Sequence, residues 1–307
     1  MPSPLRRRLV ALLGRVGVEV EPLVAGAVLI RRRGSAALVP ARSERGALVV
    51  HRGRGRKEWF RLERQLAHHM VNQHVAAILR LYRVNCVLDV GANRGQYAKS
   101  LRLLGYHGQI HSFEPVPGVF EVLAAAAAKD PKWTVHRMAL GRADGELEMN
   151  MVPGTLSSFL PSSEFGSNRY TRLNDTVVAT AEVRRLDGML DDLLRGIEGP
   201  RPYLKMDTQG FDLEAFAGLG ERAGELVGLQ SEVALLQIYD GMPRLPEALA
   251  VYEDAGFEVS AFYPVTRHAR TGRVLEFDCV MVRADAVRRT WPDPTPAAAV
   301  VDDAAGG

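Results

Sequence analysis

Two hydrophobic periodicities alternate along most of the chain. Short, continuous apolar runs of strand length are separated by longer segments in which apolar residues recur at helical spacing. The pattern predicts strands at residues 84–90, 109–113, 134–140, 203–206 and 226–235, and helices at residues 59–82, 96–104, 118–129, 186–195, 213–219 and 245–255. Helices inserted between strands at this spacing indicate a parallel sheet with right-handed crossover connections.

The last strands of the chain follow a different rule. Residues 259–262 and 277–282 predict two strands, and the turn around Thr271-Gly272 leaves too little chain for a helical crossover, so this pair is expected to be antiparallel. Residues 146–152 and 176–183 predict two added strands around a loop rich in serine, glycine and asparagine, in which residues 154–159 are either a substrate lid or a plain surface connection. The sequence therefore predicts an α/β fold: a mostly parallel seven-stranded sheet with an antiparallel last strand and helices on both faces.

Two neighbouring strand ends carry the residues that bind a nucleotide-like cofactor. One apolar run ends in Asp89-Val90-Gly91-Ala92-Asn93-Arg94-Gly95, and the next ends in Ser112-Phe113-Glu114-Pro115. Gly91 and Gly95 allow the backbone to approach a ligand closely, and the following helix offers free N–H groups to it. Glu114 can accept hydrogen bonds from both hydroxyls of a ribose.

The spacing of the glycines and the acid before them separate the candidate cofactors. A dinucleotide site usually has G-x-G-x-x-G, whereas here Asn93 interrupts a Gly91-x-x-x-Gly95 spacing, and no Lys-Ser/Thr pair forms a P-loop. The Asp89 carboxylate would repel a pyrophosphate, but it suits an ammonium or sulfonium group. S-adenosylmethionine has both cationic groups and a ribose, so it is the expected cofactor. A nicotinamide dehydrogenase is the more distant alternative.

A parallel sheet whose last strand runs backwards is the architecture of the Rossmann-like class I methyltransferases. Ligands of such sheets bind outside the carboxyl ends of the strands, at the point where the strand order reverses. Gly91, Glu114, Asp207 and Glu232 are all expected to gather at that edge.

Several motifs occur in a fixed order between residues 60 and 285. They are Val87–Gln96, Phe113-Glu114-Pro115, Ala139-Leu140-Gly141, Leu204–Gly210, Gln230-Ser231-Glu232 and Tyr239-Asp240-Gly241. In these motifs the chain resembles the FkbM-type S-adenosylmethionine-dependent methyltransferase family. The resemblance implies O-methylation of a hydroxyl on a small molecule, a sugar or glycolipid, or a polyketide. The expected cofactor-binding residues are Asp89, Gly91, Asn93, Gly95, Glu114 and Ala139.

The chain departs from the family pattern at two places. Phe211-Asp212 stands where the family usually has an aromatic residue followed by glutamate, and Glu232-Val233-Ala234 stands where Glu-Leu-Ser is frequent. Both departures leave the expected cofactor unchanged and bear on the identity of the substrate.

Methyl transfer to an alcohol needs an aligned donor and acceptor and a group that takes the hydroxyl proton. Asp207, which ends a central strand, is the leading candidate base; the alternative is that it only orders its own turn. Glu232 lies in an apolar strand and needs a partner, so it either pairs with Lys205 or faces the substrate. Asp207, Glu232 and Lys205 are the expected catalytic residues. Asp207 and Glu232, together with Asp212, also suit Mg²⁺, which stays a possible additional cofactor.

Composition and charge set the wider expectations. The hydrophobic content of 47% and charged content of 24% are ordinary for a globular protein, and no apolar run has the length of a membrane span. Cys86 and Cys279 lie in strand-like runs, so free, buried thiols and a cytoplasmic location are expected. The short apolar patch near Met1 lacks a cleavage site and does not predict a secretory signal. A non-catalytic module with the same fold remains the alternative function.

The N-terminal region is basic, with fifteen Lys/Arg against five Asp/Glu in residues 1–64 of a chain whose net charge is +3. This asymmetry suits peripheral contact with an acidic membrane surface or a solvated arm, and the lack of interleaved aromatic residues argues against nucleic acid. Three regions are expected: a basic extension (1–58) with a few short strands between residues 23 and 50, a methyltransferase domain (59–290) and a disordered tail (291–307).

Overall fold

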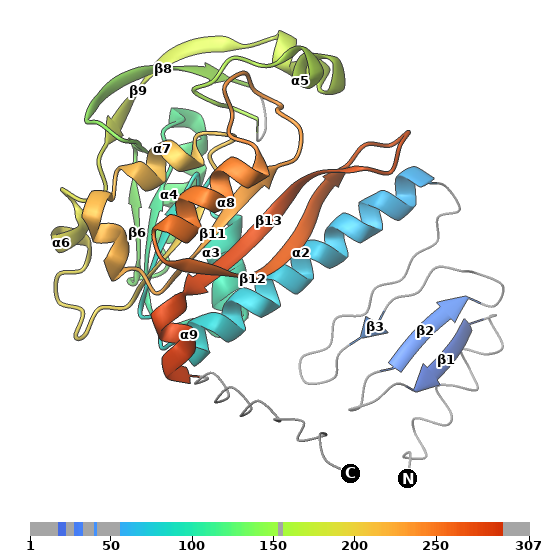
Figure 1. Ribbon diagram of the computed structural model, residues 1–307, viewed down its shortest axis with the longest axis horizontal. Helices are drawn as coiled ribbons and strands as arrows, with labels where there is room; N and C mark the ends of the chain where they lie inside the picture. Colours follow the sequence, from blue (N-terminus) through green and yellow to red (C-terminus); the bar gives the residue numbers. More distant parts are fainter. Residues whose placement is uncertain (1–17, 23–27, 33–39, 42–55, 153–155, 291–307) are drawn as a thin grey trace, which may run out of the picture. The chain divides into compact units, whose positions relative to one another are not determined.

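The computed structural model describes residues 18–22, 28–32, 40–41, 56–152 and 156–290, and it divides into two compact units, Met1–Leu66 and Ala67–Gly307 (Figure 1). In the first unit, β1 (Val18–Pro22), β2 (Val28–Arg32) and β3 (Pro40–Ala41) form an antiparallel sheet in that order. Two of these strands fall within the range expected for short strands. The tail 291–307 lies outside the described residues.

A seven-stranded sheet forms the centre of the second unit. Its strands are β4 (Cys86–Val90), β5 (Gln109–Phe113), β6 (Trp133–His136), β10 (Pro202–Met206), β11 (Gly228–Ala234), β12 (Phe257–Arg267) and β13 (Val274–Arg283). The order is β12-β13-β11-β10-β4-β5-β6, and β13 alone among them runs antiparallel to both of its neighbours. This confirms the predicted class I methyltransferase topology.

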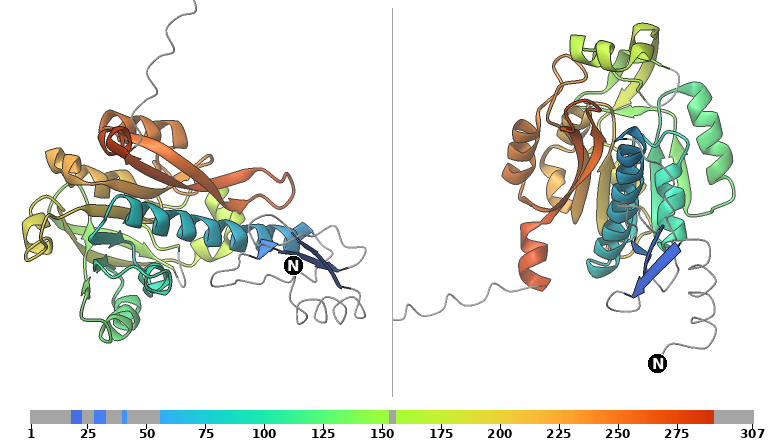
Figure 2. Two further views of the ribbon diagram at one scale, coloured as in Figure 1. Left: turned by 90° about the horizontal axis from the view of Figure 1, so that it is seen from below. Right: turned by 90° about the vertical axis from the view of Figure 1, so that its right-hand side faces the viewer.

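Helices cover both faces of this sheet, because successive strand residues point to opposite sides. Val87 joins an apolar cluster with α2 (Arg56–Leu81), α3 (Gln96–Leu103) and α4 (Pro117–Ala127). Its neighbour Leu88 joins the other cluster, with α6 (Leu190–Leu193), α7 (Asp212–Ala217) and α8 (Leu245–Asp254). Figure 2 shows the sheet between these two layers.

Several smaller expectations have clear outcomes. Cys86 and Cys279 are free and buried, as expected. Gly256 adopts a positive φ of 88° just after α8, which is typical of the glycine that ends a helix. A last helix, α9 (Ala284–Thr290), follows β13 and was not expected. None of the helices in the described part of the chain has the length and apolar character needed to cross a membrane.

The predicted strand at residues 134–140 is wrong as a single element. Its first part is β6, in the large sheet, and its second part is β7 (Ala139–Leu140), in a separate three-stranded sheet. The chain bends at Arg137 and Met138, so that Ala139 pairs with Val183 instead of continuing along β5. The small sheet has the order β7-β9-β8, with β8 at Gly145–Met151 and β9 at Val177–Arg184.

Two further local predictions need correction. The predicted helix at residues 186–195 shrinks to the single turn of α6, because Asp187 binds the N–H of Gly188 and the side chain of Arg185 instead of entering a helix. The loop expected between β8 and β9 contains α5 (Glu164–Arg169) and a 3₁₀ turn, η2 (Thr171–Asn174). Another 3₁₀ turn, η3 (Gly220–Glu225), follows α7.

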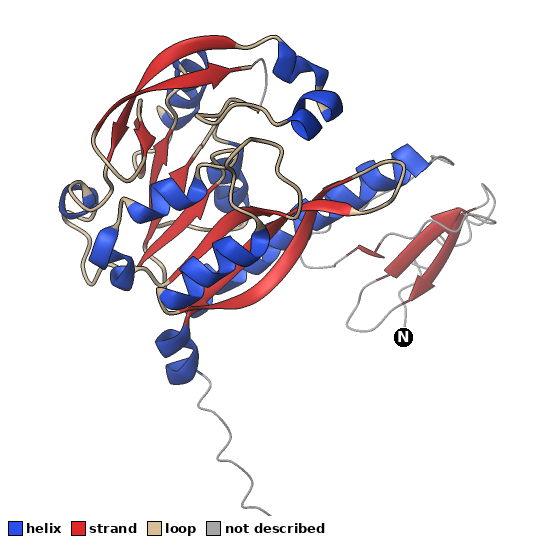
Figure 3. Ribbon diagram, turned by 45° about the horizontal axis from the view of Figure 1, so that its top comes forward, coloured by secondary structure: helices blue, strands red, loops and turns tan. Residues whose placement is uncertain are grey.

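The segment from β8 to β9 packs against the loop that follows β11. Figure 3 shows β8, β9 and α5 together at one end of the large sheet. Ser158 Oγ donates to the carbonyl of Gln209 at 2.8 Å, and the Tyr239 hydroxyl donates to the carbonyl of Leu156 at 3.0 Å. Leu156 and Tyr239 also share a buried apolar cluster. The small sheet is therefore fastened to the loops at the carboxyl ends of β10 and β11.

Candidate active site

The strand order reverses between β4 and β10, and the turns that follow these strands touch. The N–H of Asp207 donates to the carbonyl of Val90 at 3.1 Å, and the N–H of Gly91 donates to the carbonyl of Phe113 at 3.1 Å. Gly91 has a φ of 71°, and a Cβ there would lie 2.1 Å from the carbonyl oxygen of Asp207. Only glycine fits this position, which brings the ends of β4, β5 and β10 together.

The turn after β4 is held by Glu114, which follows β5. Glu114 Oε2 accepts the N–H of Asn93 at 2.8 Å, and Oε1 accepts the N–H of Val116 at 3.0 Å. Burial raises the pKa of Glu114, and the two N–H donors act in the opposite direction. Each carboxylate oxygen keeps a further lone pair, so the side chain can still accept hydrogen bonds from a ligand.

Gly95 closes the same turn against the edge of the sheet. Its φ is 76°, and a Cβ would lie 2.6 Å from the ring of Trp133. Asn93 also has a positive φ, of 49°, which asparagine tolerates better than most residues. Gly91, Asn93, Gly95 and Glu114 are thus brought together at the start of α3.

Asp89 faces the interior of the protein. It is fully buried, its Oδ2 accepts the hydroxyl of Ser112 at 3.1 Å, and its Oδ1 lies 3.1 Å from Lys205 Nζ. Trp133 Nε1 donates to Ser112 Oγ at 3.0 Å and extends this chain of hydrogen bonds across the sheet to β6. The carboxylate that was expected to attract a cationic cofactor is therefore engaged by a lysine of the protein itself.

Lys205 links the two central strands. Burial alone would lower its pKa, but Asp89 and Asp207 more than offset this effect and raise it. Lys205 Nζ lies 3.8 Å from Asp207 Oδ2 and donates to the carbonyl of Gly91 at 3.3 Å. The ring of Tyr97 lies beside it, with its centroid 5.4 Å away. Lys205 therefore stays charged and holds the turns after β4 and β10.

Asp207 and Glu232 are joined through Gln209. Gln209 Nε2 donates to Asp207 Oδ1 and to Glu232 Oε2, each at 3.1 Å, and its Oε1 accepts the hydroxyl of Tyr239 at 3.3 Å. The expected pairing of Glu232 with Lys205 is not found, because Lys205 pairs with Asp89 and Asp207. The hydrogen bond to Glu232 comes from Gln209 instead. Gln209 adopts a positive φ of 55° to reach both acids. The Asp207 side chain is 46% exposed, which leaves it accessible to an acceptor.

Asp212 has a structural role in this geometry. Its carboxylate accepts the N–H and hydroxyl of Thr208, the hydroxyl of Ser231 at 2.8 Å and the N–H of Glu232 at 3.2 Å. These donors occupy both oxygens, so Asp212 fixes the turn after β10 to β11. In the part of the chain that the structure describes, no group of three or more His, Cys, Asp or Glu residues is arranged to hold a metal ion. The Mg²⁺ alternative gains no support.

Two further acids lie beside Glu232 and were missed by the sequence reasoning. In the register of β11 and β13, Glu232 is opposite Asp278, and Ala234 is opposite Glu276. Burial, together with neighbouring carboxylates, raises the pKa of Glu276 to about 8, that of Asp278 to about 6, and that of Glu232 well above its ordinary value. The signal was available, because Glu276 and Asp278 are acids two residues apart in an otherwise apolar strand.

Two parts of the expected site, Ala139 and the loop 154–159, have no described contact with the carboxylates Asp207 and Glu232. Ala139 lies in β7 of the small sheet, where it is buried and pairs with Val183, and its cofactor contact stays a prediction. The expected lid, 154–159, lies partly outside the described residues; its described part is fixed by the bond from Ser158 to Gln209.

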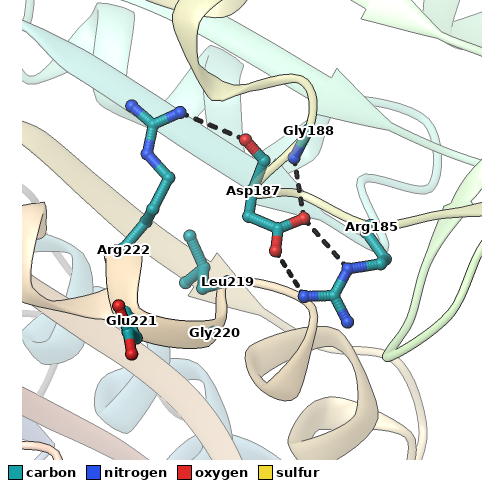
Figure 4. Close-up of a pocket in the computed structure, with 7 residues that line it drawn as sticks. All are labelled: Arg185, Asp187, Gly188, Leu219, Gly220, Glu221 and Arg222. Carbon is teal, nitrogen blue, oxygen red and sulfur yellow. Dashed lines mark hydrogen bonds and ion pairs between the residues drawn. The ribbon is translucent and has the colours of Figure 1, made fainter.

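A surface hollow elsewhere in the unit does not compete with this site. It is lined by Arg185, Asp187, Gly188, Leu219, Gly220, Glu221 and Arg222 (Figure 4). Its charges satisfy one another: Arg185 forms a two-point ion pair with Asp187, and Arg222 binds Asp191 and Glu225. The chemistry-bearing residues are instead gathered at the carboxyl edge of the large sheet.

The chain is similar to several known methyltransferases. Methyltransferase sdnD of Sordaria araneosa is 24% identical over 199 residues, which cover 57% of this chain and 74% of that protein. Among solved structures, magnesium protoporphyrin IX methyltransferase from Synechocystis PCC 6803 covers 76% of this chain and 87% of its own, with 12% identity and a TM-score of 0.41. The O-methyltransferase NcsB1 from neocarzinostatin biosynthesis covers 74% and 57%, with 14% identity and a TM-score of 0.36.

The family assignment comes from the sequence itself. The model of the methyltransferase FkbM domain matches residues 89–259, which is more than half of the chain. This range begins at the acid before the glycine-rich turn and includes Glu114, Lys205, Asp207 and Glu232. The predicted family is confirmed: the chain belongs to the FkbM methyltransferase family.

Proposed function

We propose that the protein transfers a methyl group from S-adenosylmethionine to a hydroxyl of a small molecule, a sugar or glycolipid, or a polyketide. The observation that carries the proposal is the contact between the turns after β4 and β10, where Gly91, Glu114 and Asp207 meet. A sheet of this topology binds its ligands at that reversal of strand order.

The residues present fit the cofactor. The lack of a Cβ at Gly91 lets the turn after β4 pack directly on the carbonyl of Asp207, and Glu114, which binds the same turn through the N–H of Asn93, offers acceptor lone pairs for ribose hydroxyls. Several solved structures of similar fold contain S-adenosylmethionine or its demethylated product. When bound, the cofactor supplies an electrophilic methyl group on a sulfonium. Asp89 would serve this site indirectly, through Lys205.

The side chains after β10 and β11 would then prepare the acceptor. Asp207 would take the hydroxyl proton at a carboxylate oxygen, and Gln209 keeps that carboxylate in a fixed orientation through Oδ1. Glu232, held by the same amide, would orient the acceptor. Holding the two reactants in line can supply about 7–11 kcal/mol of the barrier reduction. General base catalysis adds typically about 10²–10⁴-fold.

The cellular setting is part of the proposal. The two buried free thiols support a cytoplasmic location. Contact of the basic region 1–58 with an acidic membrane surface stays a prediction, because most of that region lies outside the described residues. The division into extension, methyltransferase domain and tail is likewise a prediction.

Incubation of the purified protein with methyl-labelled donor and an extract of the native cell tests the proposal. The expected result is one or a few labelled small molecules, absent with Asp207→Asn. Donor binding without any labelled product would favour a non-catalytic module. Protection from heat denaturation by a nicotinamide cofactor instead of S-adenosylmethionine would favour the dehydrogenase.

A further inference from the structure

Four carboxylates share one edge of the large sheet. They belong to Asp207, Glu232, Glu276 and Asp278, and this set is called the acidic face below. The pairing of β11 with β13 places the last three on the same side of the sheet, and Gln209 ties Glu232 to Asp207. Glu114 lies at the other end of the edge, beyond β4. The acidic face therefore occupies the side where an acceptor, rather than the cofactor, would lie.

The charge of the acidic face is poorly balanced from within. Lys205 reaches Asp207 at 3.8 Å, but it lies closer to the buried Asp89, at 3.1 Å. Within the described residues, no ion pair reaches Glu232, Glu276 or Asp278. Carboxylates held this close together in a partly buried place repel one another, and an added positive charge would stabilise all of them.

Gln230 indicates independently that a hydrogen-bond donor binds beside the acidic face. Its side chain is 4% exposed, and its Nε2 donates to Asp278 Oδ1 at 2.9 Å, which directs the amide toward the acidic face. Its Oε1 is buried and accepts no hydrogen bond from the described residues. A buried acceptor without a donor is costly, by about 1–3 kcal/mol. The group that would satisfy it must donate hydrogen bonds.

Tyr239 is linked to the same carboxylates, because its hydroxyl donates to Gln209 Oε1 and Gln209 Nε2 donates to Glu232. Glu276 and Glu232 also raise the pKa of Tyr170 and of Tyr239, in addition to the larger effect of burial.

We infer that the methyl acceptor carries an ammonium group that binds the acidic face, donating to Glu276, Asp278 and Gln230 while its reacting hydroxyl meets Asp207. This inference rests on the proposed function. Asp207 and Asp278 lie two strand spacings apart, or about 10 Å. An amino sugar, or an amine of similar size, spans this distance with its substituents.

Matched ligands test the inference. Methyl glycosides of aminohexoses, with their N-acetyl and N-trimethyl derivatives, are titrated by calorimetry into the full-length protein with S-adenosylhomocysteine bound. The expected result is that the free amine binds at least tenfold more tightly than the N-acetyl derivative, and that the trimethyl derivative, which keeps the charge but has no N–H to donate, binds more tightly than the N-acetyl derivative and more weakly than the free amine. The trimethyl derivative keeps its charge at every pH, so it separates charge recognition from titration of the ligand.

Isosteric variants of the acidic face test whether Glu276 and Asp278 cause the preference for the charged ligand. Glu276→Gln and Asp278→Asn should each reduce the preference for the charged ligand at least fivefold, with unchanged affinity for S-adenosylhomocysteine. Glu214→Gln, at a half-buried acid paired with Arg142, is the control and should keep the preference. Equal binding of amine and N-acetyl ligands, a preference that survives both variants, or no binding by any ammonium probe would overturn the inference. Failure of S-adenosylhomocysteine to bind would instead overturn the proposed function.

Discussion

The two sides of the carboxyl edge of the large sheet differ in what forms them. Beside β4 and β5, the expected cofactor side is formed mainly by backbone groups, whereas beside β10, β11 and β13 the expected acceptor side is formed by side chains. Gly91, Asn93 and Gly95 act through positive φ values and close approaches, and Glu114 binds two backbone N–H groups. The acceptor side instead joins Asp207 to distant residues through Gln209. A backbone site suits a cofactor that never changes, and a side-chain site can vary with the substrate.

The first prediction removes the exposed acid on the acceptor side. Asp207→Asn should lower kcat about 10²–10⁴-fold, because the amide cannot accept the hydroxyl proton. Affinity for S-adenosylmethionine should remain close to that of the wild type, since Glu114 and the glycine turn are untouched. Steady-state kinetics and calorimetry measure the two quantities. If the variant instead bound S-adenosylmethionine much more weakly but kept a normal kcat at saturating donor, Asp207 would be assigned to the cofactor site.

The second prediction breaks the pair that links the two sides. Lys205→Met leaves Asp89 buried without its cation and should lower the free energy of unfolding by about 3–5 kcal/mol. The double variant Asp89→Asn/Lys205→Met should recover part of this loss, because no buried charge remains. Urea denaturation of both variants measures the coupling. Strictly additive losses would show that the 3.1 Å ion pair does not carry this energy.

The third prediction compares two glycines with positive φ. Gly91→Ala should destabilise the fold by about 2–4 kcal/mol, since strain at positive φ adds to a backbone clash. Gly105→Ala, with a φ of 85° and open space around it, should lose only the strain, about 1–2 kcal/mol. Thermal unfolding of the pair separates the clash from the strain. Equal losses would remove the argument that Gly91 is fixed by its contact with Asp207.

The fourth prediction concerns the pH dependence of stability on the acceptor side. The folded state raises the pKa of Glu276 from 4.5 to about 8, so it holds a proton that the unfolded chain releases. Stability from this group is therefore lost as the pH rises from about 4.5 to about 8. Glu276→Gln should be more stable than the wild type at pH 9, by about 1–3 kcal/mol, and similar at pH 4.5. Denaturation at both pH values measures the difference, and a parallel pH dependence in the two proteins would contradict it.

The contrast between the two sides also explains what the sequence could predict. The cofactor side is encoded in one contiguous turn and a strand end, so Gly91, Gly95 and Glu114 were identified from spacing alone. The strands and helices of the large sheet could be predicted because hydrophobic periodicity is likewise a local property of the sequence. On the acceptor side, Glu276 and Asp278 left a local signal as two acids in an apolar strand, but only the register of β11 with β13 places them beside Glu232, and so they were missed.

Other misses have the same origin. The break after β6 was hidden because the apolar pattern continues through the bend, and only pairing of Ala139 with Val183 separates β7. The expected cofactor contact of Asp89 stays a prediction, but its ion pair with Lys205 was not expected. Its partner Lys205 is 116 residues away and is adjacent only through the pairing of β4 with β10. Long-range register, rather than local propensity, decided each of these outcomes.

Calorimetric titration of S-adenosylmethionine into wild type, Glu114→Ala and the exposed-acid control Glu121→Ala tests the central claim most directly. Each hydrogen bond lost to a charged acceptor is worth about 1.5–3 kcal/mol. Glu114→Ala should therefore bind the donor at least tenfold more weakly, with native circular dichroism, and Glu121→Ala should bind like the wild type. Unchanged affinity in a folded Glu114→Ala would contradict a cofactor site at the carboxyl ends of β4 and β5.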